Sequence, residues 1–392
     1  MTAAVVAHQA AAAKRKGGWA PRRGDGALGV FFAILFLHAA LIILVRAAIT
    51  MGWLSAPASA SVFWHGHELL LGFAAGMMGG YLVGLRNPRA VRPLLMAWLA
   101  GRVGILLMAA GEGPAWALLA LFYPLALALH SLRLFARRGL RLRNRLLGLP
   151  PVLLLGAEAL FLWSRLAGGE GTVALLLAAA AVIGMMLLMG GRLAVAAING
   201  QRQKRGLSRV VAHRDARLEW MTALGMLVWL GALLPGAGSI GRAAAVGVVL
   251  FGVLRIGFWR PGPALRSRRV RLYLLGLGWV LVGMGWHPDA ALFGPHAVLV
   301  ALHPAFVGGL GILAGSVSLQ ARLQRIVPLA ELDPSVEAAA VLFSLAAAAR
   351  LVELAGGGQA WLPVSALAWV AAALIIAMHH LAGPRAAGGG RR

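Results

Sequence analysis

The chain has 392 residues, of which 60% are hydrophobic and only 12% are charged, whereas a soluble domain carries about 25% charged residues. It has 37 lysines and arginines against 12 acidic residues, but the basic residues sit in short connections between apolar runs, which indicates membrane topology and not nucleic-acid binding. The chain has no cysteine, which excludes disulfides, thiolate metal sites, iron–sulfur clusters and cysteine nucleophiles.

The hydrophobic segments predict the fold class. Residues 1–27 are small, polar and basic without the apolar core of a signal peptide, and predict a cytoplasmic tail. A hydrocarbon layer roughly 30 Å thick needs about 20 apolar residues per helix, and the chain from 28 to 381 divides at that length. We expect an all-α, polytopic transmembrane bundle of about twelve helices forming one domain, 28–381, followed by a cytoplasmic tail, 382–392. The expected spans are 28–50, 63–85, 91–110, 114–135, 145–165, 172–198, 218–235, 238–258, 268–287, 295–319, 336–355 and 361–381.

The basic residues predict the orientation of the bundle. Lysine and arginine are retained on the cytoplasmic side of a membrane, and alternate connections of this chain are rich in them. This pattern places both termini in the cytoplasm (N-in/C-in). The connections assigned to that side are 86–92, 133–145, 202–217, 255–271 and 322–325.

Three ionisable residues are expected near the middle of the membrane: His38, Arg102 and Glu158. Each costs about 2.5 to 3.5 kcal/mol on insertion scales, so each is a functional candidate. Arg102 and Glu158 could also neutralise each other as a purely structural ion pair, and both interpretations stay open.

Histidines gather at the predicted outer ends of three spans. His65 and His67 begin the second span, His287 ends the ninth, and His296 and His303 lie in the tenth. Helix positions two apart point in nearly opposite directions, so His65 and His67 are expected to face different partners. The group could bind a metal or haem iron, or its members could be interfacial anchors.

Two further patterns have a functional and a structural interpretation. Gly190-Gly191-Arg192 and Asn199 close the sixth span, where Arg192 could bind an acidic group or a haem propionate, or could anchor the helix end. Runs of methionine near helix interiors could be copper ligands or ordinary packing; these are Met77, Met78, Met185, Met186 and Met189.

Several motifs, in order along most of the chain, resemble the NnrS family. The second span begins with Trp64-His65-Gly66-His67-Glu68 and continues with Leu71-Gly72-Phe73, similar to the family's WHxHE and GF signature. The other matching landmarks are Ala97-Trp98-Leu99-Ala100-Gly101-Arg102, Gly190-Gly191-Arg192, Asn199 and Ala301-Leu302-His303.

The resemblance implies a function that composition and spacing do not. Members are described as bacterial inner-membrane proteins that contain haem and copper and are linked to nitric oxide metabolism and nitrosative-stress resistance. It therefore implies haem b and copper as cofactors and nitric oxide as a small-molecule ligand. The predicted partners are the lipid bilayer and, for a subunit that has lost its cofactors, a membrane electron-transfer or oxidase complex. The residues expected to bind the cofactors are His65, His67, His303, Arg102 and Arg192, with the three histidines as metal ligands.

The chain departs from the family pattern at three places. The run after Arg192 is apolar, Leu193-Ala194-Val195-Ala196-Ala197-Ile198, where members have polar and aromatic residues. Gly276-Leu277-Gly278-Trp279 and Ser318-Leu319-Gln320 stand where histidine-containing segments are expected. Two family histidines are thus missing, so the chain would hold fewer cofactors or none, unless His38, His287 or His296 replaces them.

Two other functions fit the same topology. Twelve spans with buried Arg102 and Glu158 suit a secondary transporter with a central substrate site, and loss of cofactors would suit an accessory subunit of an electron-transfer complex. Nucleophile-elbow, P-loop and zinc-protease motifs are all missing from the sequence, so no ordinary enzyme class is indicated.

Overall fold

The structure is a computed structural model, and it describes residues 25–55, 62–111, 113–137, 139–232, 238–286, 290–326 and 331–383. Within these ranges the chain is helical and has no strand, which confirms the all-α prediction. His287 and nearly all of both predicted tails lie outside the described residues.

The first half of the chain contributes helices that match the first six expected spans. They are α2 (Asp25–Thr50), α3 (Val62–His67), α4 (Ala75–Gly79), α5 (Val91–Ala109), α6 (Ala117–Phe135), α7 (Leu142–Arg145), α8 (Leu149–Leu166), α9 (Thr172–Met185) and α10 (Gly191–Lys204). Pro150 and Pro151 interrupt no helix, because both lie in the first turn of α8, where a missing N–H has no cost.

The second half contributes helices that cover the remaining expected spans. They are α11 (Ala212–Gly231), α12 (Gly238–Trp259), α13 (Arg268–Gly285), α14 (Ala290–Ala301), α15 (Gly311–Ile326), α16 (Pro334–Val352) and α17 (Trp361–Ala382). Five π-helical segments continue or join these helices: η1 (Glu68–Ala74), η2 (Gly80–Gly84), η6 (Met186–Gly190), η8 (Ala305–Leu310) and η9 (Glu353–Gly357).

Nine helices in the described ranges are long and apolar enough to cross a membrane. Three expected spans, 63–85, 218–235 and 268–287, fall on helical segments outside these nine. The first is divided by π-helical turns, while α11 and α13 begin with charged residues. The chain is therefore a multi-pass helical membrane protein, whereas the count of twelve and the N-in/C-in orientation stay predictions.

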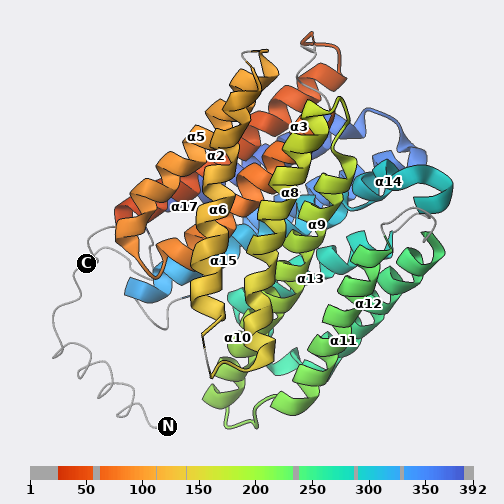
Figure 1. Cartoon of the computed structure of the whole chain (residues 1–392). Coiled ribbons are helices and arrows are strands. Elements are labelled where there is room, and N and C mark those ends of the chain that lie inside the picture. The colour runs from red at the N-terminus through yellow and green to blue at the C-terminus, as the bar shows by residue number, and fades with distance from the viewer. Residues whose placement is uncertain are drawn as a thin grey trace.

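The helices pack in a closed circuit, in which the first and last helices are neighbours. Going around it, α2 contacts α5, α5 contacts α6, α6 contacts α8, α8 contacts α9, and α9 reaches the α11–α12 hairpin. From α12 the contacts continue through α13, α15, α16 and α17 back to α2. Figure 1 shows the α11–α12 hairpin at one edge of the bundle, far from α5 and α6.

The second expected span, 63–85, corresponds to residues 62–84 of the structure and lies in the interior of the bundle. From His67 to Gly84 nearly every residue is buried, among neighbours from α2, α5, α6, α8 and α9. Close packing at its inner end depends on Gly80, since a Cβ there would lie 2.4 Å from the ring of Phe32. Burial on all sides explains why this span carries the polar residues that lipid would not tolerate.

Large apolar side chains cover the outer surface of the bundle. Many of them are more than half exposed, as expected where lipid and not water is the solvent. Examples on six different helices are Leu41, Met96, Leu118, Trp163, Leu224 and Leu367.

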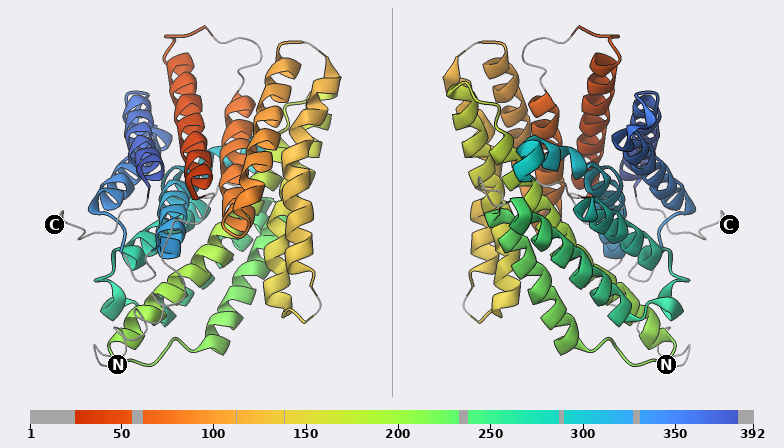
Figure 2. Two further views of the ribbon diagram at one scale, coloured as in Figure 1. Left: turned by 90° about the vertical axis from the view of Figure 1, so that its left-hand side faces the viewer. Right: turned by 90° about the vertical axis from the view of Figure 1, so that its right-hand side faces the viewer.

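The longest continuous helix runs through α9, η6 and α10, from Thr172 to Lys204, over 33 residues. Its first half contacts α8 and α3, and its second half contacts α13. In Figure 2 the α10 half runs obliquely to the helices around it. It therefore links the part of the bundle around α3 to the part around α11, and each part contains a buried ionic cluster.

Candidate functional site

The first ionic cluster surrounds Glu68, the opening residue of η1, and we call it the Glu68 cluster. Its members come from four separated spans, and all but His38 have side chains less than a tenth exposed. They are His38 on α2, His67 and Glu68 at the α3–η1 junction, Arg102 on α5 and Glu158 on α8.

Glu68 holds the cluster together through both of its carboxylate oxygens. Arg102 Nη1 donates to Oε1 over 2.9 Å, and His67 Nδ1 lies 3.2 Å from the same oxygen. The other oxygen, Oε2, lies 3.0 Å from His38 Nε2. Gly72 makes room for this group, because a Cβ there would lie 3.1 Å from the Arg102 guanidinium and 3.3 Å from His38 Nε2.

Both ring nitrogens of His67 face carboxylate oxygens. Nδ1 faces Glu68, and Nε2 lies 2.9 Å from Glu158 Oε1. A neutral imidazole has only one N–H, so one of these contacts would set two lone pairs against each other. The cluster must therefore hold one extra proton, either on His67 as imidazolium or on one of the two carboxyl groups.

Three polar atoms of the Glu68 cluster are buried without a hydrogen bond. One is His38 Nε2, which still lies 3.0 Å from Glu68 Oε2; the other two are Glu158 Oε2 and Arg102 Nε. Aromatic rings close the cluster, with Phe161 4.5 Å from the His67 ring and Trp98 5.0 Å from the His38 ring, measured between centroids. A buried polar atom without a partner costs about 1 to 3 kcal/mol, so these two atoms are the points at which the cluster could accept a ligand or water.

Arg102 pairs with Glu68, and not with Glu158 as the sequence suggested. Glu158 instead binds His67, although its charge still acts on Arg102. The ion pair expected between two residues is thus a network of five.

His65 and His303 form a second group close by. His65 lies on α3, and His303 lies between α14 and η8. Electrostatic interaction links His303 with His65, and both with Arg350 on α16. His65 therefore faces different partners from His67, as the spacing of two residues predicts.

Each imidazole of this pair has a nitrogen free for another partner. His65 Nδ1 is buried and has no hydrogen-bond partner. His303 Nδ1 lies 2.7 Å from the Val300 carbonyl oxygen, so this nitrogen carries the proton and Nε2 keeps its lone pair. Metal-binding histidines are commonly oriented by such a hydrogen bond from the other ring nitrogen.

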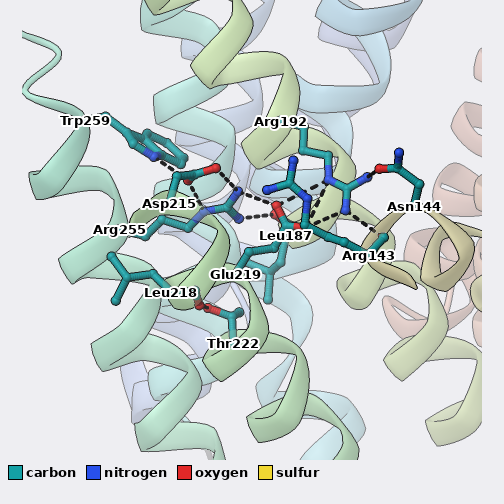
Figure 3. A network of polar contacts seen from close by, with 10 residues as sticks. All are labelled: Arg143, Asn144, Leu187, Arg192, Asp215, Leu218, Glu219, Thr222, Arg255 and Trp259. Carbon is teal, nitrogen blue, oxygen red and sulfur yellow. Dashed lines mark hydrogen bonds and ion pairs between the residues drawn. The ribbon is translucent and has the colours of Figure 1, made fainter. Parts of the chain in front are cut away.

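Arg192, the last of the five residues expected to bind a cofactor, belongs to a separate ionic cluster around Glu219. We call it the Glu219 cluster (Figure 3). Arg192 Nε donates to Glu219 Oε1 over 3.0 Å, and its two terminal nitrogens donate to the Asn144 side chain and the Arg143 carbonyl. The acidic group that Arg192 binds is thus one of the chain's own.

Arg255 approaches Glu219 from the opposite side to Arg192, as Figure 3 shows. Its Nη2 donates to Glu219 Oε2 over 2.8 Å, and its Nε donates to Asp215 Oδ1 over 2.7 Å. Trp259 Nε1 donates to the same Asp215 oxygen. Gly191 makes room for Arg255, since a Cβ there would lie 2.7 Å from Nη1.

Of the residues around Glu219, only Arg192 was predicted as a site residue. Asp215 was expected in the connection 202–217 and Arg255 in the connection 255–271, but both are buried in helices, at 5% and 3% exposure. Helix α11 begins at Ala212, earlier than expected, because Arg255 neutralises its two carboxylates. The spacing of Asp215 and Glu219, four residues apart and so on one helix face, was the available signal.

The expected site residues therefore fall into three places. His67 and Arg102 lie together in the Glu68 cluster, His65 and His303 form the neighbouring pair, and Arg192 lies in the Glu219 cluster. His296 stacks edge-on against Phe63, with 5.7 Å between ring centroids. In the described ranges no group of three or more histidine or carboxylate side chains is arranged to hold a metal ion.

Apolar spanning helices with buried ionic clusters in the bundle define a multi-pass membrane protein whose interior is specialised for polar chemistry. The sequence model of the family described as NnrS protein matches residues 29–385, nearly the whole chain. The chain belongs to the NnrS family. No curated protein and no solved structure matches it.

Proposed function

We propose that this chain is an NnrS-type protein of the bacterial inner membrane that acts in nitric oxide metabolism or in resistance to nitrosative stress. We further propose that it binds a metal ion through His65 and His303, at the outer side of the membrane. Family membership supports the cellular role, and one structural observation supports the metal site. That observation concerns the ring nitrogens: His65 Nδ1 is buried without a hydrogen-bond partner, and the Val300 carbonyl leaves His303 Nε2 with its lone pair.

The surroundings of the pair suit metal binding. The Val300 carbonyl fixes the His303 tautomer, so that Nε2 presents a lone pair. When bound, copper or haem iron would supply a coordination position open to a small ligand such as nitric oxide.

The donor set favours a single copper ion over haem. Imidazole suits copper, and two imidazole ligands can hold a single ion. A haem needs a slot for its whole ring, and His65 and His303 line neither the cavity around Met77, Met186 and Leu310 nor the one around Pro150, Gly184 and Met226. Haem b and the participation of His67 stay predictions, since His67 would have to give up a carboxylate contact to coordinate a metal.

Metal analysis of the detergent-purified full chain tests the site. We expect stoichiometric copper in the wild type, and loss of most of it in His65→Ala and in His303→Ala. His213→Ala is the matched control, because His213 is exposed at the start of α11. Unchanged copper in both site variants would refute the assignment, and a Soret band lost in the same variants would show that haem is the bound group.

The cellular role needs a separate test in the native host. Deleting the gene should increase sensitivity to a nitric oxide donor, and the wild-type chain should restore resistance. Equal growth of the deletion and parent strains under the donor would contradict this role without bearing on the metal site.

Secondary transport is a second candidate, favoured by the spare buried atoms of the Glu68 cluster. Glu158 Oε2 and Arg102 Nε are polar atoms within the bundle that have no hydrogen-bond partner, as expected where a substrate or ion binds. Proton-dependent uptake by proteoliposomes, abolished by Glu158→Gln, would establish this function.

A further inference from the structure

The described part of the chain contains a partly open apolar cavity of about 110 Å³ that the proposed metal site does not use. It lies between the segment 74–81, the helix α9–η6–α10 and the segment 310–318. Five methionines from two spans converge on it: Met77, Met78, Met185, Met186 and Met189.

The cavity is built by irregular helix turns. Of the five π-helical segments in the described residues, four contribute to its lining, through Ala74 of η1, Tyr81 of η2, Met186 of η6 and Leu310 of η8. A π-helical turn contains one extra residue and is frequent at functional sites. Four such turns around one cavity, drawn from three different spans, argue against an accidental packing gap.

The lining decides which kind of ligand fits. Thioethers can bind Cu(I), but no charged side chain is among the described residues that line the cavity. A cation there would be buried without a counter-ion, at a cost of several kcal/mol. The chemistry of the lining therefore favours an uncharged ligand over a metal ion.

Water fits the cavity poorly. A buried water needs two to four polar partners, and the only polar side chains in the lining are Tyr81 and Ser318. The Ser318 hydroxyl already donates to the Ala314 carbonyl over 2.6 Å. An apolar cavity of this kind stays dry and binds apolar guests.

We propose that this cavity binds a small, uncharged, apolar molecule of the size of a dissolved diatomic gas. An engineered apolar cavity of about 150 Å³ holds benzene or xenon, so the present volume suits a smaller guest. Such molecules dissolve readily in the hydrocarbon of a bilayer, which surrounds the bundle. The inference does not depend on the metal site at His65 and His303.

Xenon NMR on the full chain in detergent tests the proposal, with xenon as the probe. We expect a saturable bound-xenon signal in the wild type, distinct from xenon dissolved in micelles. Ala314→Leu, which fills the cavity, should abolish this signal. The matched control is Ala243→Leu, which adds the same side chain at an exposed position of α12 and should keep it.

Two further variants keep the result decisive. Val182→Ile adds one methylene to the lining and should weaken or shift the xenon signal even if Ala314→Leu fails to fold. Met186→Leu with Met189→Leu preserves apolar volume and should retain the signal. The proposal is overturned if the wild type shows no saturable signal, if both filling variants leave it unchanged, or if Cu(I) binds stoichiometrically and displaces xenon only while Met186 and Met189 are present.

Discussion

The Glu68 and Glu219 clusters both neutralise charge that is buried in a membrane bundle, but they do so with different side chains. Around Glu219 the partners are arginines, and Arg192 and Arg255 each donate through several nitrogens of the guanidinium. Around Glu68 the partners include two histidines and one arginine, and three buried atoms of the cluster stay without a hydrogen bond.

This difference indicates a structural role for the Glu219 cluster and a protonation state that can change for the Glu68 cluster. Arginine stays protonated at any accessible pH, and its planar fork binds carboxylates with fixed geometry. The Glu219 cluster should therefore hold α10, α11 and α12 together permanently. Histidine gains and loses a proton near neutral pH, so the Glu68 cluster can take up or release charge. We expect function in the Glu68 cluster and its neighbouring histidines, and stability from the Glu219 cluster.

The largest expected effect comes from Glu219→Ala. This change leaves Arg192 without a carboxylate and Arg255 with Asp215 alone. Removing one partner of a buried ion pair costs about 3 to 5 kcal/mol, so the thermal unfolding midpoint in detergent and the yield should fall sharply. Glu170→Gln, at an exposed position, should change neither; a wild-type midpoint for Glu219→Ala would contradict the structural role.

A smaller loss is expected from Glu68→Ala. Arg102 would still feel the charge of Glu158, so its charge would not be left alone. We expect a cost of about 1 to 3 kcal/mol, the range for an unsatisfied buried polar group, measured by the same unfolding assay. A loss equal to or larger than that of Glu219→Ala would remove the distinction between the clusters.

Arginine-to-lysine changes in the two clusters test the same difference between them. Arg192→Lys cannot reach Glu219, Asn144 and the Arg143 carbonyl together, and each lost hydrogen bond to a charged group is worth about 1.5 kcal/mol or more. Arg102 donates to Glu68 through Nη1, a contact that one ammonium could replace. Unfolding midpoints should therefore rank Arg102→Lys above Arg192→Lys, and the reverse order would refute this account.

The smallest effect is expected at Asp333, outside the spanning segments. It caps α16 by accepting from Ser335 N over 3.0 Å, and hydrogen bonds from Ser335 hold its pKa below the ordinary 3.8. Asp333→Ala should cost about 1 kcal/mol at pH 7. A lowered pKa stabilises the folded state above pH 3.8, and this stabilisation is lost as the pH falls from 3.8 through the lower pKa of the folded state, so the difference from wild type should shrink in acid. A difference in acid equal to that at pH 7 would contradict the ionic part of the cap.

Much of the fold could be predicted from the sequence, because span length and hydrophobicity reflect the bilayer directly. The positions of His65 and His67 on different faces also followed from helix geometry. The pairing of charges could not be predicted, since hydropathy treats every buried charge as a cost and assigns it to a loop. Asp215 and Arg255 were misplaced for this reason, and Arg102 was matched with Glu158 because both lie at a similar depth. The partner that neutralises a buried charge lies on another helix. The depth of a residue along its own helix does not show which helix that is.

The helix from Thr172 to Lys204 also bears on the choice of membrane. Its 33 residues give a rod about 50 Å long at 1.5 Å per residue, against a hydrocarbon layer of roughly 30 Å. One end is apolar, while the other carries Arg202 and Lys204, which need water. The surplus length must be taken up by tilt, by local thickening of the bilayer or by projection of the charged end. The stability of this protein should therefore depend on membrane thickness, and lipids of different chain length should shift it.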